Sequence, residues 1–430
     1  MRALVLVPVL KQPRQAAAAV GEAVAAPPRR SDESRLEEAI GLARAIDLTI
    51  VQGLIVQVSQ PRPATLIGTG KIEEIKHLLD EHDAGLVIVD HPLTPVQQRN
   101  LEKVLGVPVE IVDADHQNKP DIASNIARQW FDTNQVDAIM ELTTSSVALA
   151  VQAIAKEKKK IDIVTGAATT ELTGKQCSPY GFHWAYDTHA LAVGTGGALV
   201  KQGGDSWFFL TADYAFGYSL EQQTSDFVKA NGGKVVGSVR HPLASTDYSS
   251  FLLQAQSSGA KVVGLANAGA DTQNAIKQAA EFGITQSGQR LAALLFTLAE
   301  VHGLGLQAAQ GLTLTEGFYW NRDDESRKFG ERFMKRTGKM PNMIHAGTYS
   351  AVLQYLKAVE KAGTDETEAV AKVLHELPVD DVFGRGGTVG KNGRMIHDMY
   401  LLEVKKPADS KAPWDYYNVL ATIPGKEAYI

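Results

Sequence analysis

Short apolar runs alternate with segments of helical periodicity along most of the 430 residues, and this alternation limits the possible folds more than any other feature. Four apolar runs are predicted strands, at residues 85–90, 109–113, 138–141 and 162–165. The helices predicted between them cover residues 94–105, 124–131 and 145–156. Strands that alternate with helices form parallel sheets with right-handed crossovers. The sequence therefore predicts an α/β fold.

The pattern continues on both sides of this region, with predicted strands at 49–58, 207–211, 234–240, 262–266 and 291–296. Two helix starts carry recognisable signals. Ser34 is followed three residues later by Glu37, which predicts a capping box, and Thr94 is the expected cap of its helix.

Composition excludes several classes of protein. A hydrophobic content of 44% and a charged content of 21% allow two or three domain-sized cores. The net charge of -6 gives no diffuse attraction to nucleic acid, so no DNA partner is expected. A single cysteine, Cys177, excludes an intrachain disulfide.

Membrane and export signals are also missing from the sequence. No run of about 18 apolar residues predicts a membrane span. The apolar run at the amino terminus is interrupted by Pro8 and Lys11 and is too short for a signal peptide, so a cytoplasmic location is expected for the chain as written.

Catalytic patterns are sparse. Gly68-Thr-Gly-Lys lacks the spacing of a phosphate-binding loop, and neither a His-Glu-x-x-His pattern nor a cysteine pair for zinc occurs. Asp113, Asp115 and His116 lie close together but are expected to be solvated rather than to bind metal. We therefore expect no enzyme activity, no cofactor and no metal.

Residues 1–113 resemble the N-terminal domain of HflX-type ribosome-associated GTPases. The resemblance rests on Ser34-Arg-Leu-Glu-Glu-Ala, Ile67-Gly-Thr-Gly-Lys-Ile-Glu-Glu-Ile and Asp90-His-Pro-Leu-Thr-Pro-Val-Gln-Gln-Arg. It covers about a quarter of the chain and ends before any nucleotide-binding domain, so the ribosome is the partner that it implies.

Residues 109–430 resemble solute-binding proteins of the ABC transporters for branched-chain amino acids and aromatic acids. Asp113-Ala-Asp-His-Gln-Asn-Lys-Pro, Leu142-Thr-Thr-Ser-Ser, Thr211-Ala-Asp-Tyr-Ala-Phe-Gly and His397-Asp-Met-Tyr-Leu carry this resemblance. It implies a two-lobed type I periplasmic-binding-protein-like fold whose lobes close on a ligand. The family's own first strand, pocket loop and helix are missing, and residues 90–93 would replace that loop.

The two resemblances together imply three parts. An HflX-like segment covers residues 1–113, the first lobe covers 85–185 with 321–375, and the second lobe covers 186–320 with 376–430. Residues 85–113 belong to two parts because the segment is expected to merge into the first lobe. Such a chain could be a fusion of two families, engineered or natural, or one diverged domain.

Two loops of the first lobe are candidates for binding a carboxylate. Ligands of parallel sheets bind beyond the carboxyl ends of the strands, where a helix N-terminus favours an anion. By resemblance, the ligand carboxylate would be held by Leu142, Thr144, Ser145, Ala167 and Thr169. Thr144 or Ser145 could instead only cap its helix.

The second lobe supplies further candidates. Tyr214 or Phe216 would form an aromatic wall, Asn267 a polar group, and Asp271 the partner of a ligand ammonium, although the family usually has Glu there. Asp271 could instead be the N-cap of a helix that begins at Thr272. Trp184, on a crossing segment, could stack on an aromatic ligand or only pack the hinge.

The expected function is reversible, non-catalytic binding of a small carboxylic acid, either an amino acid or an aromatic acid. In the family the ligand passes to an ABC permease. The alternatives are an HflX-like module that interacts with the ribosome, and a structural chimera without surviving activity.

Overall fold

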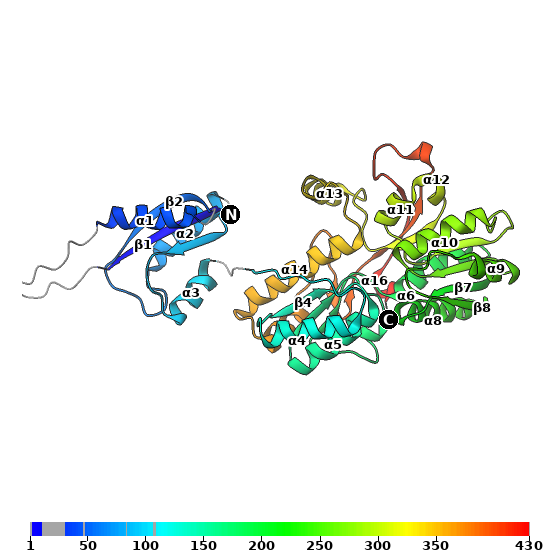
Figure 1. The fold of residues 1–430 in the computed structure, drawn as a ribbon, viewed down its shortest axis with the longest axis horizontal. Coiled ribbons are helices and arrows are strands. Elements are labelled where there is room, and N and C mark those ends of the chain that lie inside the picture. Colours follow the sequence, from blue (N-terminus) through cyan, green and yellow to red (C-terminus); the bar gives the residue numbers. More distant parts are fainter. Residues whose placement is uncertain (1, 11–30, 46–47, 83, 106–108, 430) are drawn as a thin grey trace, which may run out of the picture. The chain divides into compact units, whose positions relative to one another are not determined.

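The chain divides after Asp113 into two units, Met1–Asp113 and Ala114–Ile430, and the computed structural model describes residues 2–10, 31–45, 48–82, 84–105 and 109–429. Figure 1 labels the helices and strands of both units. Each unit has its own sheets and its own hydrophobic core.

The first unit is a parallel three-stranded sheet with helices. Its elements are β1 Arg2–Leu10, α1 Asp32–Ala45, β2 Thr49–Val58, α2 Thr69–Glu81, β3 Leu86–Val89 and α3 Pro95–Leu105. The sheet order is β2-β1-β3, with β1 in the centre. Leu4 and Leu6 of β1 pack with Ile72 and Ile75 of α2, which lie at helical spacing on one face.

The second unit begins with the first lobe, whose parallel sheet has the order β4-β5-β6. Its elements are α4 Pro120–Asp132, β4 Ala138–Glu141, α5 Ser145–Lys158, β5 Ile161–Val164, η1 Thr170–Leu172 and β6 Gly181–His183. Residues 147, 148, 151, 154 and 155 of α5 are buried, and this helical stripe packs the helix into the core of the lobe. Figure 1 shows α4 and α5 together beside β4.

Later segments complete this part of the unit: α13 Asp324–Thr337, α14 Met343–Ala362, α15 Thr367–Glu376, β12 Thr388–Val389 and β13 Met395–Ile396. The Phe329 ring of α13 lies 5.0 Å from the Tyr349 ring of α14. Arg394 forms a parallel bridge with His183 of β6, so the segment 388–396 lies against the first sheet.

The second lobe contains a parallel sheet of order β10-β9-β7-β8. Its strands are β7 Ser206–Ala212, β8 Lys234–His241, β9 Val262–Ala266 and β10 Arg290–Ala293. Its helices are α6 Thr188–Leu191, the π-helix η2 Ala192–Gly196, α7 Gly197–Lys201, α8 Ala215–Ala230, α9 Ser249–Ser257, α10 Gly269–Glu281, α11 Leu298–Leu304 and α12 Leu306–Ala309. Every residue of β7 is buried, as expected for an inner strand.

An antiparallel sheet of order β11-β14-β15 follows, formed by β11 Thr313–Glu316, β14 Met399–Val404 and β15 Tyr417–Ile423. The short helices η3 Pro407–Asp409 and α16 Gly425–Ala428 complete the unit.

Three chain segments meet between the lobes. A side chain at Gly317 would lie 2.9 Å from His397 Cε1 and 3.2 Å from the Ala185 carbonyl oxygen, so only glycine fits where these segments touch. The His397 Nε2 atom lies 2.9 Å from the same Ala185 oxygen. These contacts hold residues 184–187, 317–320 and 397–399 together.

The predicted strand at 109–113 is wrong. These residues are irregular, and Ile111 is 83% exposed. A strand needs a neighbouring strand to hydrogen-bond with its backbone groups. The strands before and after residues 109–113 pair elsewhere: β3 pairs with β1, and β4 pairs with β5. Within the described residues the two units share no sheet, so the expected merging of the N-terminal segment into the first lobe is not observed.

Helix starts agree in part with the sequence analysis. Thr94 and Gln97 bond each other's backbone N–H groups, which confirms the cap predicted at Thr94. The predicted cap at Ser34 is wrong: α1 begins at Asp32, and the Ser31 hydroxyl accepts the bond from the Ser34 N–H.

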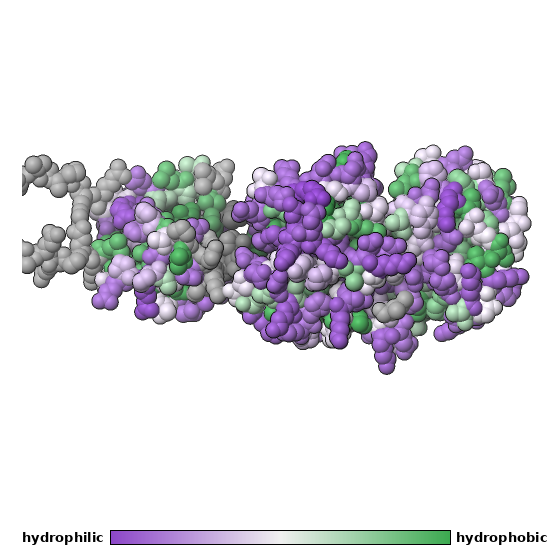
Figure 2. All heavy atoms as spheres, turned by 90° about the horizontal axis from the view of Figure 1, so that it is seen from below, coloured by the Kyte–Doolittle hydropathy of each residue, from purple (hydrophilic) through white to green (hydrophobic). Residues whose placement is uncertain are grey.

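The described residues contain no helix that is both long and apolar enough to cross a membrane. Figure 2 shows mainly hydrophilic side chains, with scattered apolar ones, on the visible face of the second unit.

Candidate functional site

The two loops predicted to hold a carboxylate meet at the N-terminus of α5. The Ser145 hydroxyl accepts hydrogen bonds from the backbone N–H groups of Ala168 at 3.4 Å and Thr169 at 3.3 Å. Ser145, Ala167 and Thr169 are each 1% exposed. The structure thus brings these predicted residues together in one buried place.

Leu142 and Thr144 precede the helix in the same loop, and both are buried. Thr144 is the N-cap residue of α5 by position, but its side chain makes no capping hydrogen bond. Its hydroxyl donates instead to the Asn118 side-chain oxygen. The simple capping alternative is therefore not observed for Thr144.

Asn118 is a site residue that the sequence analysis missed. It lies in the irregular loop before α4, and both Gln117 and Asn118 have left-handed backbone angles, with φ of 53° and 57°. Asparagine adopts this conformation more readily than most residues. The motif around Asn118 was noticed, but only the fold shows that its side chain reaches Thr144.

Residues next to the hinge hold the second loop in place. The Ala167 oxygen lies 2.8 Å from His183 Nε2, and the Gly166 oxygen accepts from the Tyr186 hydroxyl at 2.6 Å. Burial, together with the charge of Arg394, lowers the pKa of His183 well below its usual value, so this imidazole is neutral and donates through Nε2.

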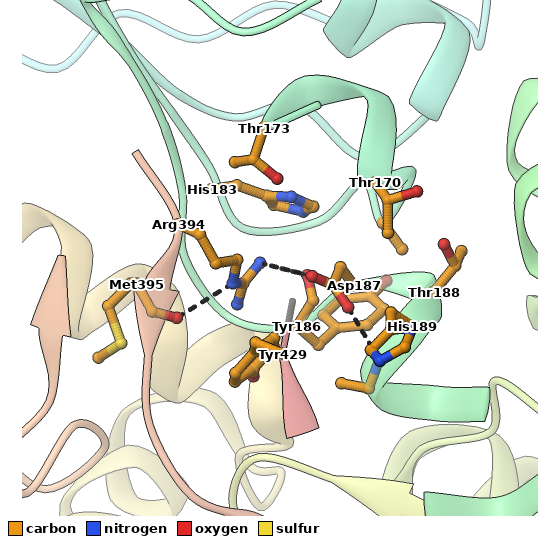
Figure 3. Close-up of polar contacts among 12 residues, drawn as sticks. Thr170, Thr173, His183, Tyr186, Asp187, Thr188, His189, Arg394, Met395 and Tyr429 are labelled. Atoms are coloured by element: carbon orange, nitrogen blue, oxygen red, sulfur yellow. Dashed lines mark hydrogen bonds and ion pairs between the residues drawn. The ribbon is translucent and has the colours of Figure 1, made fainter. Parts of the chain in front are cut away.

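Arg394 organises the hinge side of the site, as Figure 3 shows. Its guanidinium donates to the carbonyl oxygens of Trp184 at 2.9 Å, Tyr186 at 3.0 Å and Met395 at 3.0 Å. It also lies 3.8 Å from the Asp187 carboxylate and 4.1 Å from the centre of the Tyr429 ring. One buried cation therefore ties the segment after β6 to the carboxyl-terminal part of the chain.

The predicted aromatic wall lies at the start of α8. Tyr214 occupies the N-cap position, and its ring centre lies 5.8 Å from that of Phe216. Burial and the charge of Asp271 raise the pKa of Tyr214, which keeps its hydroxyl neutral. Phe216 is 3% exposed and belongs to the core, so Tyr214 is the more accessible of the two.

Asn267 and Asp271 lie at the carboxyl end of β9 and in α10. The Asn267 side chain is fully buried, accepts from the Thr272 hydroxyl at 2.7 Å and lies 3.1 Å from His241 Nε2. Asp271 accepts from the Tyr248 hydroxyl at 2.8 Å and from the Ala244 N–H at 3.2 Å. Both side chains thus order their own lobe.

The alternative interpretation of Asp271 as an N-cap is wrong, because α10 begins at Gly269 and its N-cap residue is Ala268. Gly269, the first residue of α10, has a left-handed φ of 59°, a conformation that glycine adopts without the steric cost of a side chain.

Trp184 packs the hinge in this structure. It is fully buried, and its indole N–H donates to the Ser350 hydroxyl at 3.0 Å. With its ring enclosed in the core, the packing alternative accounts for all that the structure shows of this residue.

A cavity of about 600 Å³ lies beside these residues. Its lining is mostly polar. The loop around η1 contributes Thr170, Glu171, Thr173, Gly174 and Lys175, α8 contributes Ala215, Tyr218, Ser219, Gln222 and Gln223, and Asp187 and Asn392 complete the lining. The Gln223 amide donates to the Thr170 hydroxyl at 3.4 Å, from one lobe to the other. None of the ten predicted residues lines this cavity, although Thr169 precedes Thr170 in the chain, and Tyr214 and Phe216 flank Ala215.

Glu141 is a second residue that the sequence analysis missed. It ends β4, and both of its carboxylate oxygens accept from the Thr143 hydroxyl, at 2.9 and 2.8 Å. A side chain at Gly166 would collide with this carboxylate, so Glu141 fills the space between the two loops. The position of an acidic residue at the end of a predicted strand is the only sequence feature that could have indicated Glu141 as a site residue.

Two protein families match different parts of the chain. Residues 96–411 match the family described as periplasmic binding protein, and residues 33–115 match the N-terminal domain of GTP-binding GTPases. GTPase HflX from Magnetococcus marinus is 35% identical over 74 residues, which are 17% of that protein. Little of such a GTPase is therefore represented here.

Relatives of the larger part are solute-binding proteins. A periplasmic binding protein from Burkholderia mallei has a crystal structure that is 51% identical with a TM-score of 0.74, covering 84% of this chain and 92% of that one. A branched-chain amino acid ABC transporter periplasmic ligand-binding protein from Burkholderia xenovorans is 36% identical with a TM-score of 0.67, covering 84% and 92%. A Leu/Ile/Val-binding protein homolog from Brucella melitensis is 27% identical, covering 63% and 70%.

The fold agrees with these matches, since two lobes with parallel sheets meet at three crossing segments. The family match spans well over half of the chain, and the aligned Burkholderia mallei protein has about half of its residues in common with it. The chain therefore belongs to the periplasmic binding protein family.

Proposed function

We propose that the second unit binds a small carboxylic acid, either an amino acid or an aromatic acid, reversibly and without catalysis between its two lobes. The observation that carries this proposal is the meeting of Ser145 with the N–H groups of Ala168 and Thr169 at the N-terminus of α5. The positive end of the helix dipole favours an anion at this place.

The hydrogen bonds at this place are long. N–H···O bonds in proteins are typically about 2.9–3.0 Å, whereas those to Ser145 measure 3.3 and 3.4 Å. A ligand carboxylate could therefore replace the serine oxygen as acceptor and receive the serine hydroxyl as an additional donor. Charge-assisted bonds of this kind are stronger than neutral ones.

The names of the relatives support the ligand class. The Burkholderia xenovorans and Brucella melitensis proteins carry names that refer to branched-chain amino acids. Solute-binding proteins of this family deliver their ligand to an ABC permease. We propose an ABC permease as the partner of the second unit alone, and not of the first unit.

Isothermal titration tests this proposal on the full chain, with leucine, phenylalanine, benzoate and 2-oxo acids as ligands. We expect Ser145→Ala to raise the Kd of every acid that binds by roughly tenfold or more, because a bond to a charged group is lost. Ser250→Ala, at an exposed position of α9, is the matched control. Unchanged affinity in Ser145→Ala would contradict this assignment of the site.

A second candidate function concerns the first unit. Its match to the GTPase N-terminal family over residues 33–115 favours a contact with the ribosome. Co-sedimentation of the full chain with ribosomes tests this, with the isolated second unit as the control. Equal amounts of both chains in the ribosome pellet would contradict it.

A further inference from the structure

Glu141 has an unusual backbone for a strand end. Glu141 and Leu142 are consecutive residues with left-handed angles, at φ of 80° and 58°, and neither is glycine. Such conformations persist only where the surrounding structure enforces them, and they concentrate at functional sites. The turn places the Glu141 carboxylate between the Thr143 hydroxyl and the open face of Gly166.

The carboxylate of Glu141 has spare capacity for hydrogen bonds. An ionised carboxylate offers about four acceptor positions, and the Thr143 hydroxyl is its hydrogen-bond donor in this structure. Among the described residues no lysine, arginine or histidine lies within ion-pair distance of it. Burial raises the pKa of Glu141, and this effect outweighs the opposing effects of the Thr143 hydrogen bonds and of the charge of His116.

Asp271, the acid expected to bind a ligand ammonium, is already engaged. One of its oxygens accepts from the Tyr248 hydroxyl and the other from the Ala244 N–H. Those bonds hold residues 244–248 against α10, so the carboxylate has a structural task within its lobe. The role of ammonium partner is therefore open to another acid.

We propose that Glu141 binds the ammonium group of the ligand, so that the site selects α-amino acids over carboxylic acids that lack the amino group. This inference rests on the proposed function, because it assumes that the ligand carboxylate lies at Ser145, Ala168 and Thr169. The Gly166 N–H donates to the Glu141 carbonyl oxygen at 3.1 Å, and Ala168 follows two residues later in the same loop, so Glu141 adjoins the loop that would hold the carboxylate. An α-amino acid carries its ammonium group on the carbon next to its carboxylate, so a ligand held at this loop would bring both charges to the two neighbouring loops.

Charge explains the selectivity in both directions. An ammonium group would give the partly buried Glu141 carboxylate a countercharge at ion-pair distance, in addition to the more distant charge of His116. A carboxylic acid without an amino group would bring a second negative charge close to Glu141 and gain nothing in return. Discrimination of this type depends on repulsion of the wrong ligand as well as attraction of the right one.

The test uses two pairs of ligands that differ only in the amino group: L-leucine with 4-methylpentanoate, and L-phenylalanine with 3-phenylpropanoate. Isothermal titration of the full chain should give tighter binding of the amino acid in each pair. Glu141→Gln should weaken the amino acid roughly tenfold to hundredfold and leave the deaminated acid unchanged or bound more tightly. If Glu141 had only a structural role, the substitution would weaken the deaminated acid as much as the amino acid.

Three variants accompany this measurement. Glu157→Gln, at an exposed carboxylate near the end of α5, should leave both affinities unchanged. Asp271→Asn should not alter the ratio of affinities within a pair. Glu141→Asp retains the charge on a shorter side chain and should give an intermediate ratio, which provides a measurement if Glu141→Gln does not fold.

Several results would overturn the inference while leaving the proposed function intact. These are equal weakening of both members of a pair by Glu141→Gln, loss of selectivity in Asp271→Asn instead, or a wild-type chain that binds the deaminated acids at least as tightly. If the wild-type chain binds no member of either pair and no other carboxylic acid, the proposed function itself fails.

Discussion

Two buried acids of the second unit are held without a countercharge. Asp162 in β5 is fully buried, and neither of its carboxylate oxygens has a side-chain partner among the described residues. Glu316 in β11 is also fully buried, but accepts from the Leu298 N–H, the Met343 N–H and the Tyr417 hydroxyl. Both acids therefore make stability depend on pH.

Burial raises the pKa of Glu316 to about 8. An acid whose pKa is higher in the folded than in the unfolded state stabilises the fold while it is protonated, and this stabilisation is lost as the pH rises. Between pH 6.5 and 8 we expect the free energy of unfolding to fall, by up to about 1.4 kcal/mol per pH unit for one group. His183 and His397 have lowered pKa values and are neutral in the folded state, and their opposing contribution to the slope fades as the pH rises above the unfolded value of about 6.5.

Urea unfolding at several pH values measures this effect. Glu316→Gln should remove the part of the slope that Glu316 causes between pH 6.5 and 8. An unchanged slope in the variant would show that Glu316 does not titrate as described.

Asp162 gives a prediction of the same sign. Burial raises its pKa well above the usual value. Asp162→Asn removes the cost of keeping a proton on this acid, so we expect the variant to be more stable than wild type at pH 8, by at least about 1 kcal/mol, with a smaller difference near pH 5. Asp137→Asn, at an exposed position before β4, is the control. A less stable Asp162→Asn variant at pH 8 would contradict the account.

At the scale of elements, the buried side chain of Arg394 joins segments of the hinge that are far apart in the sequence. Arg394 is 1% exposed and bonds to three backbone oxygens that belong to two distant parts of the chain. Removal of one partner from a buried ion pair leaves an uncompensated charge. Here that charge would be Asp187, which also accepts the capping bond from the Ala190 N–H of α6.

Arg394→Ala should therefore lower the free energy of unfolding by roughly 3–5 kcal/mol. Arg336→Ala, at an exposed position in the last turn of α13, should change it by less than about 0.5 kcal/mol. Chemical denaturation of the three chains measures both values. A loss below about 1 kcal/mol for Arg394→Ala would mean that other contacts hold the hinge.

Elements with strong local signals could be predicted from the sequence. Strand β4 was predicted at its observed bounds, and α5 was predicted from Ser145, because a hydroxyl before a helical apolar stripe is a local signal. The strand at 109–113 was predicted from its apolar residues alone, and in the described part of the chain no strand pairs with it.

Site residues divide in the same way. Ser145, Ala167 and Thr169 follow predicted strands, so their meeting could be expected. Asn118 and Arg394 could not, because Arg394 bonds to residues 208 and 210 positions away and Asn118 to one 26 positions away. Contacts over such distances depend on the completed fold.

At the scale of the whole molecule, the chain consists of two units with separate sheets and cores. Residues 109–116, on both sides of the boundary between the units, have no regular structure, and Val109, Ile111 and Val112 are exposed. Each unit should therefore persist after the chain is cut between them.

Limited proteolysis tests this arrangement. Thermolysin should cut at Ile111 or Val112 and release a resistant fragment that contains the second unit, and mass spectrometry should place its start between residues 109 and 114. Early cuts within residues 120–429, with 109–113 still intact, would contradict the division into units.

The central claim is that the second unit has a functional binding site for a small carboxylic acid. Thermal unfolding of the full chain, with and without branched-chain amino acids, aromatic acids and 2-oxo acids, tests it most directly. A ligand at about 100 times its Kd should stabilise the second unit by roughly 2.7 kcal/mol and raise the Tm of its transition. A cooperative transition that no acid shifts would contradict the claim.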